Sequence, residues 1–262
     1  MTHPGDERSP GIFLAGPAEA SDLATLLSRA RSLDANAAVR LQGFGHALAT
    51  WVPVIYPSTI MDRSPVVLGL RAVTLARPSD MDLTVPASAL LDRLARYSLI
   101  DPAIAGEPVR IGAPPQEVAA PWAGMVAPRS GWTKHGVVSA HHVRDVARAG
   151  IQKVADTVPT DSGAAVVSKV RSDIWGASSG WGPLEVPDIP DGAAFGLDVL
   201  GFIPPSEVEV AVDAEETGQW LRLSTQAGHV VVKNAQRCSA RAVHHGVRSP
   251  VEIIPHDAVM QG

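Results

Sequence analysis

The sequence predicts an α+β fold with two halves, each built from antiparallel strands packed with helices. Segments in which apolar and polar residues alternate, a pattern typical of half-buried strands, occur in both halves of the 262-residue chain. Segments with apolar residues at helical spacing accompany them in both halves. The chain is 45% hydrophobic and 19% charged, which is sufficient to bury a core.

Shifts in composition predict the domain organisation, with a stretch rich in proline and glycine between the halves. We expect a flexible leader over residues 1–18, an N-terminal α+β half over 19–100, a linker over 101–135, a C-terminal α+β half over 136–236 and a tail over 237–262.

In the N-terminal half, Ser21 is a suitable cap for a helix that ends near Ser32. Its apolar face holds Leu23, Leu26, Leu27 and Ala30. Strand-like runs over 37–42 and 47–54 flank a glycine-containing turn and predict a hairpin. A third run covers 65–76, and a short strand, 83–85, precedes a helix from about Ala87 to Tyr97.

In the C-terminal half, Ser139 is expected to cap a helix that ends near Asp156. Gly150 inside this helix indicates a break or a close approach by another group. The remaining expected elements are helices over 162–175 and 191–201, a short strand over 184–186, and strands over 207–212, 220–225 and 229–233.

Charge is unevenly distributed along the chain, whose net charge is −5. The segment 122–182 holds seven basic and four acidic residues, whereas 183–220 holds nine acidic residues and no Lys or Arg. This asymmetry indicates either two surfaces with different partners or two solvated faces.

Several features favour a cytoplasmic location. Cys238 is the single cysteine, which excludes an internal disulfide and fits a reducing compartment. No apolar stretch is long enough to span a membrane, and the first ten residues do not have the pattern of a signal peptide. We therefore expect no membrane partner.

Motifs that carry chemistry are not found. The sequence has no phosphate-binding loop, no dinucleotide-binding glycine spacing and no nucleophile elbow. No pair of histidines has the i, i+4 spacing of a helical zinc site. The sequence therefore predicts no catalytic residue, no cofactor and no metal ligand, and it favours a protein that is not an enzyme.

Two sets of residues are candidates for binding. Trp122, Trp132, Trp175 and Trp181 lie in or beside loops, where they form a partner surface if exposed and hold loops onto the core if buried. The basic residues Arg144, Arg148 and Lys153 are candidate nucleic-acid contacts.

Three segments, Val66–Leu94, Pro128–Trp132 and Gly218–Val232, resemble an uncharacterised protein family of high-GC actinobacteria. The resemblance covers about residues 21–234. It implies a bacterial cytoplasmic protein and implies no activity.

Two looser similarities suggest nucleic-acid binding. Three strands followed by the segment 83–94 resemble a subdomain of a sliding DNA clamp. The three helices and following strands of 139–233 resemble a winged helix, whose recognition helix would be 191–201. That helix has no Lys, Arg, Asn or Gln to read DNA, which weighs against the second similarity.

Three functional hypotheses follow. The first is a non-enzymatic interaction or regulatory protein with a protein partner or self-association. The second is a nucleic-acid-binding protein. The third is an enzyme with an unrecognised site, which requires a pocket where polar groups such as His141, Asp145 and Glu209 converge.

Overall fold

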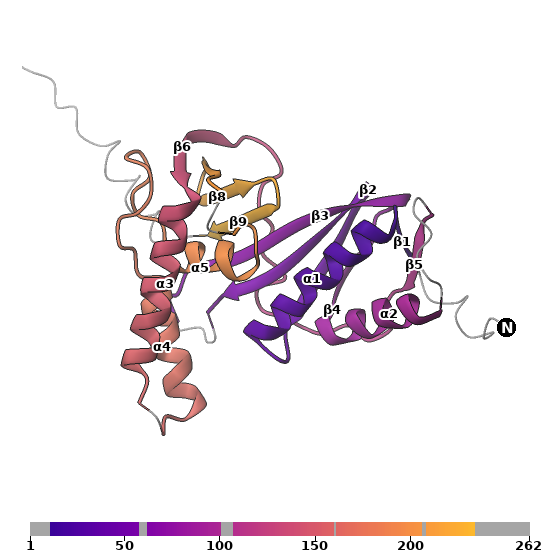
Figure 1. Ribbon diagram of the computed structural model, residues 1–262, viewed down its shortest axis with the longest axis horizontal. Coiled ribbons are helices and arrows are strands. Elements are labelled where there is room, and N and C mark those ends of the chain that lie inside the picture. Colours follow the sequence, from indigo (N-terminus) through magenta and orange to yellow (C-terminus); the bar gives the residue numbers. More distant parts are fainter. Residues whose placement is uncertain (1–10, 58–61, 101–106, 160, 206–207, 234–262) are drawn as a thin grey trace, which may run out of the picture.

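The computed structural model describes residues 11–57, 62–100, 107–159, 161–205 and 208–233. It confirms the α+β class: helices cover one face of an antiparallel sheet (Figure 1). The helices are α1 (Pro17–Leu33), α2 (Ala87–Ile100), α3 (Ala140–Thr157), α4 (Ala164–Gly176) and α5 (Asp191–Val199). The strands are β1 (Gly11–Leu14), β2 (Ala38–Ile55), β3 (Val66–Ser79), β4 (Asp82–Pro86), β5 (Val109–Gly112), β6 (Thr133–Ser139), β7 (Ala211–Thr217), β8 (Trp220–Thr225) and β9 (Gly228–Lys233).

The sheet runs through both halves of the chain in the order β4-β2-β3-β9-β8-β7-β6. Strand β3 joins the halves, because residues along one of its edges pair with two different strands. Its residues Val66 to Leu70 pair with β9, and Leu75 pairs with β1, which in turn pairs with β5. The two halves therefore share one backbone hydrogen-bond network.

The hairpin predicted between 37–42 and 47–54 is wrong, since both runs belong to the single strand β2. The first part of β2 pairs with β4 and the rest pairs with β3. Gly43 lies so close to β3 that a Cβ there would be 2.6 Å from the carbonyl oxygen of Ser79. Gly45 has a φ of 61°, in the region that favours glycine. The glycines thus allow a bend within one strand.

The flexible leader predicted for residues 1–18 differs from the structure over residues 11–18, while residues 1–10 lie outside the described part. Strand β1 and the first turn of α1 occupy this segment. Helix α1 begins at Pro17 instead of after Ser21, because proline suits the first turn of a helix. Its predicted apolar face is buried.

The linker predicted over 101–135 is partly built into the sheet. Strand β5 lies inside it and β6 begins there; residues 101–106 lie outside the described part. Residues 113–132, which we call the connector, pack on the sheet face opposite the helices. Trp122 is buried against Val66 and Leu68, and Ala127 packs in a second cluster with Trp220 and Val231. The connector has irregular backbone, as its prolines predict, but it covers the core.

The helices of the C-terminal half lie near their predicted positions, and the hydroxyl of Ser139 caps α3 as expected. Helices α3 and α4 form a hairpin that extends beyond the sheet (Figure 1). The strand predicted at 184–186 is wrong: this segment is a turn in which Leu184 is 95% exposed. The strand predicted at 207–212 begins later, as β7, whereas β8 and β9 are confirmed. Residues 234–262, which include the predicted tail, lie outside the described part.

Candidate interaction surfaces

The tryptophans predicted to form a partner surface are mostly buried. Trp122, Trp175 and Trp181 are only 2%, 3% and 5% exposed, so for these three the buried alternative holds and they pack onto the core. Trp175 stacks on Phe195 with ring centroids 4.3 Å apart. Trp132 is half-buried, and the guanidinium of Arg222 lies 4.5 Å from its ring centroid. Apolar burial therefore accounts for most of these aromatic residues.

The three basic residues proposed for nucleic-acid contact divide into two groups. Arg144 is buried and donates a hydrogen bond to the carbonyl oxygen of Pro204, so its guanidinium cannot reach a phosphate. Arg148 is exposed and lies 4.0 Å from Asp145, and Lys153 is also exposed on α3. Nucleic-acid contact remains a prediction for Arg148 and Lys153.

The helix that would be the recognition helix of a winged-helix fold, α5, lies inside the molecule. Its residues Gly192 to Leu197 are buried, and the helix contacts α3, α4 and strands of the sheet. A recognition helix must enter the major groove from an exposed position. The winged-helix interpretation is therefore wrong, because α5 is an apolar core helix rich in small residues.

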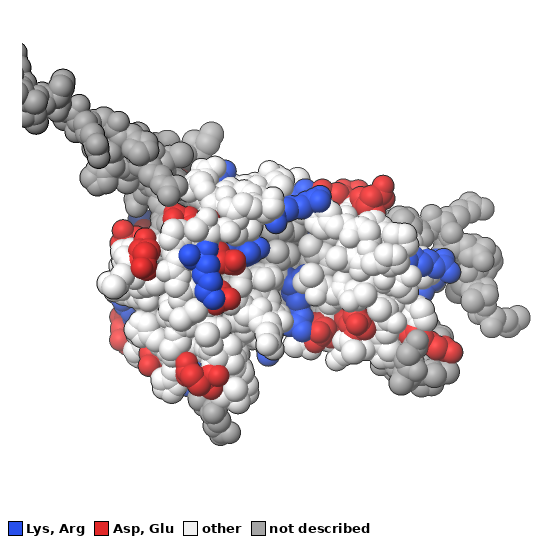
Figure 2. All heavy atoms as spheres, turned by 90° about the horizontal axis from the view of Figure 1, so that it is seen from above, with Lys and Arg blue, Asp and Glu red and all other residues white. Residues whose placement is uncertain are grey.

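The face of the molecule in Figure 2 has basic and acidic side chains in small groups of mixed sign. Ion pairs between residues far apart in the chain join Arg71 with Asp22 and Lys134 with Asp213. Opposite charges at such short range largely cancel the attraction for a phosphate backbone. This face has no broad basic surface for a nucleic acid.

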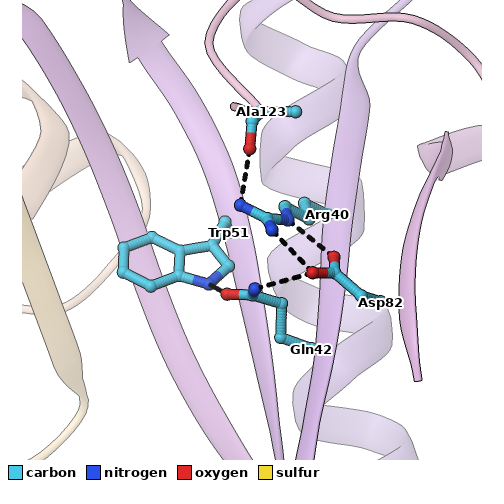
Figure 3. Close-up of polar contacts among 5 residues, drawn as sticks. All are labelled: Arg40, Gln42, Trp51, Asp82 and Ala123. Carbon is cyan, nitrogen blue, oxygen red and sulfur yellow. Dashed lines mark hydrogen bonds and ion pairs between the residues drawn. The ribbon is translucent and has the colours of Figure 1, made fainter. Parts of the chain in front are cut away.

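A polar network lies between β2, β4 and the connector (Figure 3). Arg40 donates to both carboxylate oxygens of Asp82, from Nε to Oδ1 over 2.7 Å and from Nη2 to Oδ2 over 2.6 Å. It also donates to the carbonyl oxygen of Ala123 in the connector. Gln42 donates to Asp82 and accepts a hydrogen bond from the indole of Trp51. The hydrogen bond from Arg40 is the main cause that lowers the pKa of Asp82. The network uses its polar groups internally and anchors the connector.

A second network lies on the same sheet face, across β7, β8 and β9. Glu215 accepts hydrogen bonds from Nε of Arg222 over 2.8 Å and from the hydroxyl of Ser224 over 3.0 Å. Nδ1 of His229 lies 2.9 Å from the Ser224 hydroxyl. In a hydrolytic triad the histidine lies between the serine and the acid, whereas here the serine lies between the other two. The hydroxyl of Ser224 therefore donates its hydrogen bond to Glu215 and not to His229. This arrangement does not activate the hydroxyl as a nucleophile.

The pKa values of this network move in the directions that its contacts require. The hydrogen bond from Arg222 lowers the pKa of Glu215. Burial lowers the pKa of His229, and the nearby Arg222 lowers it further. Near pH 7 the carboxylate of Glu215 is thus charged and the imidazole of His229 is neutral. The network is an ion pair between Arg222 and Glu215 to which the neutral Ser224 and His229 are hydrogen-bonded in turn.

Two neighbouring hollows run along α4 where it faces the N-terminal half. Their volumes are about 720 and 430 Å³, and both are lined by Ser168 and Ser172. None of His141, Asp145 and Glu209 lines these hollows, so the convergent set required by the enzyme hypothesis is not formed there. Among the described residues, no group of three His, Cys, Asp or Glu side chains could hold a metal ion.

Strand β6 is an edge of the sheet. Among the described strands it pairs only with β7, so the opposite backbone edge of its seven residues has no neighbouring strand. Val137 projects from the sheet face away from the core and is 53% exposed. On the other face, Pro183 packs so close to Gly136 that a Cβ there would lie 2.9 Å from that of Pro183. An exposed valine on one face and a half-buried proline on the other therefore flank a backbone edge that no described strand pairs with.

None of the helices in the described ranges is long and apolar enough to cross a membrane.

Two family models match the chain, and both describe domains of unknown function. One, DUF8010, matches residues 8–112, and the other, DUF8185, matches residues 127–237. These matches confirm the resemblance to an uncharacterised family. No curated protein matches the chain.

Among solved structures, DNA polymerase III beta subunits are similar at low identity. The Caulobacter crescentus protein is 14% identical with a TM-score of 0.43, and the match covers 86% of this chain and 65% of that chain. The Pseudomonas aeruginosa protein is 14% identical with a TM-score of 0.40, and the match covers 86% and 63% of the two chains. The sliding clamp from Bartonella birtlesii is 13% identical with a TM-score of 0.42 and coverages of 85% and 62%. This chain spans less than two thirds of the length of these proteins.

Proposed function

We propose that this chain is a non-enzymatic interaction protein that assembles with a second copy of itself along β6. The observation that carries the proposal is the unpaired edge of this strand. An edge strand presents a row of N–H and C=O groups that another strand can complete. Pairing of edge strands is also a recurrent mode of protein recognition.

The sequence of β6 fits antiparallel pairing with itself. If two copies pair with Val137 opposite Val137, then Gly136 of each copy faces Val138 of the other, and His135 faces Ser139. Like charges directly opposite each other would destabilise the pair, and this register has none. Such a contact is symmetric and closes as a dimer.

Burial of the exposed valine supports the same register. Directly opposite side chains in an antiparallel pair lie about 4.5–5.5 Å apart, so the two Val137 side chains would cover each other. Leu184, exposed in the turn that follows Pro183, adds apolar surface near the other face of the strand.

The same strand limits how tightly it can associate. A bulge between Lys134 and Gly136 interrupts the register with β7, and bulges and lysines are features that weaken edge pairing. The regular part of the edge is therefore short. We expect a weak dimer whose population depends on concentration.

The test compares two valines of equal exposure by size-exclusion chromatography with light scattering. Val137 and Val208 are each 53% exposed, so Val137→Lys and Val208→Lys add the same charge at equally accessible positions. The wild type and Val208→Lys should become dimeric as concentration rises, and Val137→Lys should stay monomeric. A wild type that is monomeric at every concentration, or a dimer that Val137→Lys leaves intact, would overturn the proposal.

A further inference from the structure

A small hollow of about 190 Å³ lies where α1 faces the segment that follows α5. It is at the junction of the two halves, since α1 and β3 form one side and the residues after α5 form the other. Its lining residues are Asp22, Thr25, Leu26, Arg29, Arg71, Leu200 and Gly201. Two guanidinium groups therefore share a space large enough for a small ligand.

Arg71 is held in place by its own contacts. It donates one hydrogen bond to Asp22 on α1 and another, of 2.6 Å, to the carbonyl oxygen of Ala227. The carboxylate of Asp22 balances its charge. These contacts fix the orientation of the Arg71 guanidinium, and the carboxylate of Asp22 is bound to it.

Arg29 provides donors that make no hydrogen bond to a described residue, although its charge acts on Asp198. Gly201, with a φ of 66°, leaves open the space in which the Arg29 guanidinium lies, and a Cβ at this glycine would collide with it. Among the residues that the structure describes, none accepts a hydrogen bond from the Arg29 side chain. Guanidinium groups have several N–H donors in a planar fork, and these match an oxyanion.

The charges around the hollow leave a positive excess. Among the lining residues, Asp22 pairs with Arg71, so the charge of Arg29 is not balanced by a second lining acid. Asp198 lies outside the lining, where the charges of Arg144, Arg148 and Arg29 all act on it. A small anion that enters the hollow therefore meets no unpaired carboxylate that would repel it.

We propose that this hollow binds a small oxyanion, a phosphate or carboxylate group, between the guanidinium groups of Arg29 and Arg71. The ligand accepts hydrogen bonds from Arg29 in the bidentate arrangement that guanidinium groups favour. Because the site spans α1 and the Gly201 segment, the bound anion links the two halves on the helix side of the sheet.

Isothermal titration with inorganic phosphate, at constant ionic strength, tests the site. Arg29→Gln removes the free donors, whereas Arg31→Gln removes an equal charge from an exposed position two residues along the same helix. The wild type and Arg31→Gln should bind phosphate alike, and Arg29→Gln should bind at least about tenfold more weakly. Arg29→Lys, which keeps the charge and loses the planar fork, should also bind more weakly than the wild type.

A parallel titration with acetate distinguishes the two sources of the oxyanion. Preference for phosphate identifies a phosphate group as the ligand, and preference for acetate identifies a carboxylate. Circular dichroism of each variant establishes that it is folded. No binding of either anion to the wild type would overturn the proposal, as would equal losses in Arg29→Gln and Arg31→Gln, which indicate attraction by net charge alone.

Discussion

At Gly150 in α3, the ring of Trp175 occupies the space that a side chain would need. The sequence indicated a break or a close approach at this glycine, and the structure shows the close approach. Helix α3 continues through the position without interruption. The absence of a Cβ here lets α4 pack against α3 through its buried tryptophan.

Gly150→Ala should therefore destabilise the protein although alanine is the better helix former. Helix propensity alone would predict a gain of about 1 kcal/mol, whereas overpacking against Trp175 should cost about 1–3 kcal/mol. Chemical denaturation of Gly150→Ala and of Ala149→Gly, at the exposed neighbouring position, separates the two effects. Both variants should be less stable than the wild type; a more stable Gly150→Ala would contradict the packing.

His229 should make the free energy of unfolding fall as the pH drops from neutral through its unfolded pKa of about 6.5. Burial lowers its pKa in the folded state, while the unfolded value is about 6.5. The unfolded state then binds more protons in this range, so the free energy of unfolding decreases as the pH falls through 6.5. This loss is complete once the pH lies below the folded pKa.

The matched variants for this effect are His229→Asn and, at an exposed histidine of α3, His141→Asn. Denaturation across the pH range should show a smaller acid loss for His229→Asn than for the wild type, with His141→Asn resembling the wild type. Equal acid losses in all three proteins would show that His229 does not contribute.

The connector is the element that sequence patterns described least well. Its prolines and glycines predicted irregular backbone, and that much is found. Its packing depends on apolar residues such as Trp122 and Ala127, which have no periodicity within an irregular segment to indicate burial. Single-sequence patterns therefore indicate a linker where the structure has a covering layer.

Arg40→Ala should loosen this layer. The change removes the hydrogen bond to Ala123 and leaves Asp82 without its main partner. Because hydrogen bonds to charged groups contribute about 1.5–3 kcal/mol and Asp82 is half-exposed, a loss near the lower value is expected. Thermal unfolding measures the loss, and limited proteolysis should cut the connector faster.

The exposed Arg96 on α2 provides the control for this experiment. Arg96→Ala should keep the stability of the wild type and its rate of cleavage in the connector. Equal cleavage rates in Arg40→Ala and the wild type would show that the polar network does not hold the connector.

Helices were easier to predict than strand neighbours. The apolar faces of α1, α2 and α3 repeat at helical spacing, so their cores are visible in sequence. Strand alternation shows which side chains face the core but not which strand lies alongside. For this reason the sequence predicts a turn where β2 bends: Gly43 and Gly45 are compatible both with a turn between two strands and with a bend within one strand.

Over the whole molecule, the feature that local patterns could not predict is the shared sheet. Pairing of Val66 to Leu70 with β9 joins segments about 160 residues apart, which no local signal reports. That pairing makes β6 an outer edge of the sheet. The candidate interface therefore follows from the topology of the whole chain, whereas the predicted tryptophan surface was inferred from loops whose aromatic residues are buried.

Amide hydrogen exchange measured at increasing protein concentration tests the β6 interface most directly. If two copies pair along this strand, exchange of amides in Thr133–Ser139 should slow as concentration rises, while exchange in β4 at the other edge stays constant. Val137→Lys should show no such slowing. Concentration-independent exchange in β6 of the wild type, together with a constant monomeric mass, would contradict assembly through this edge.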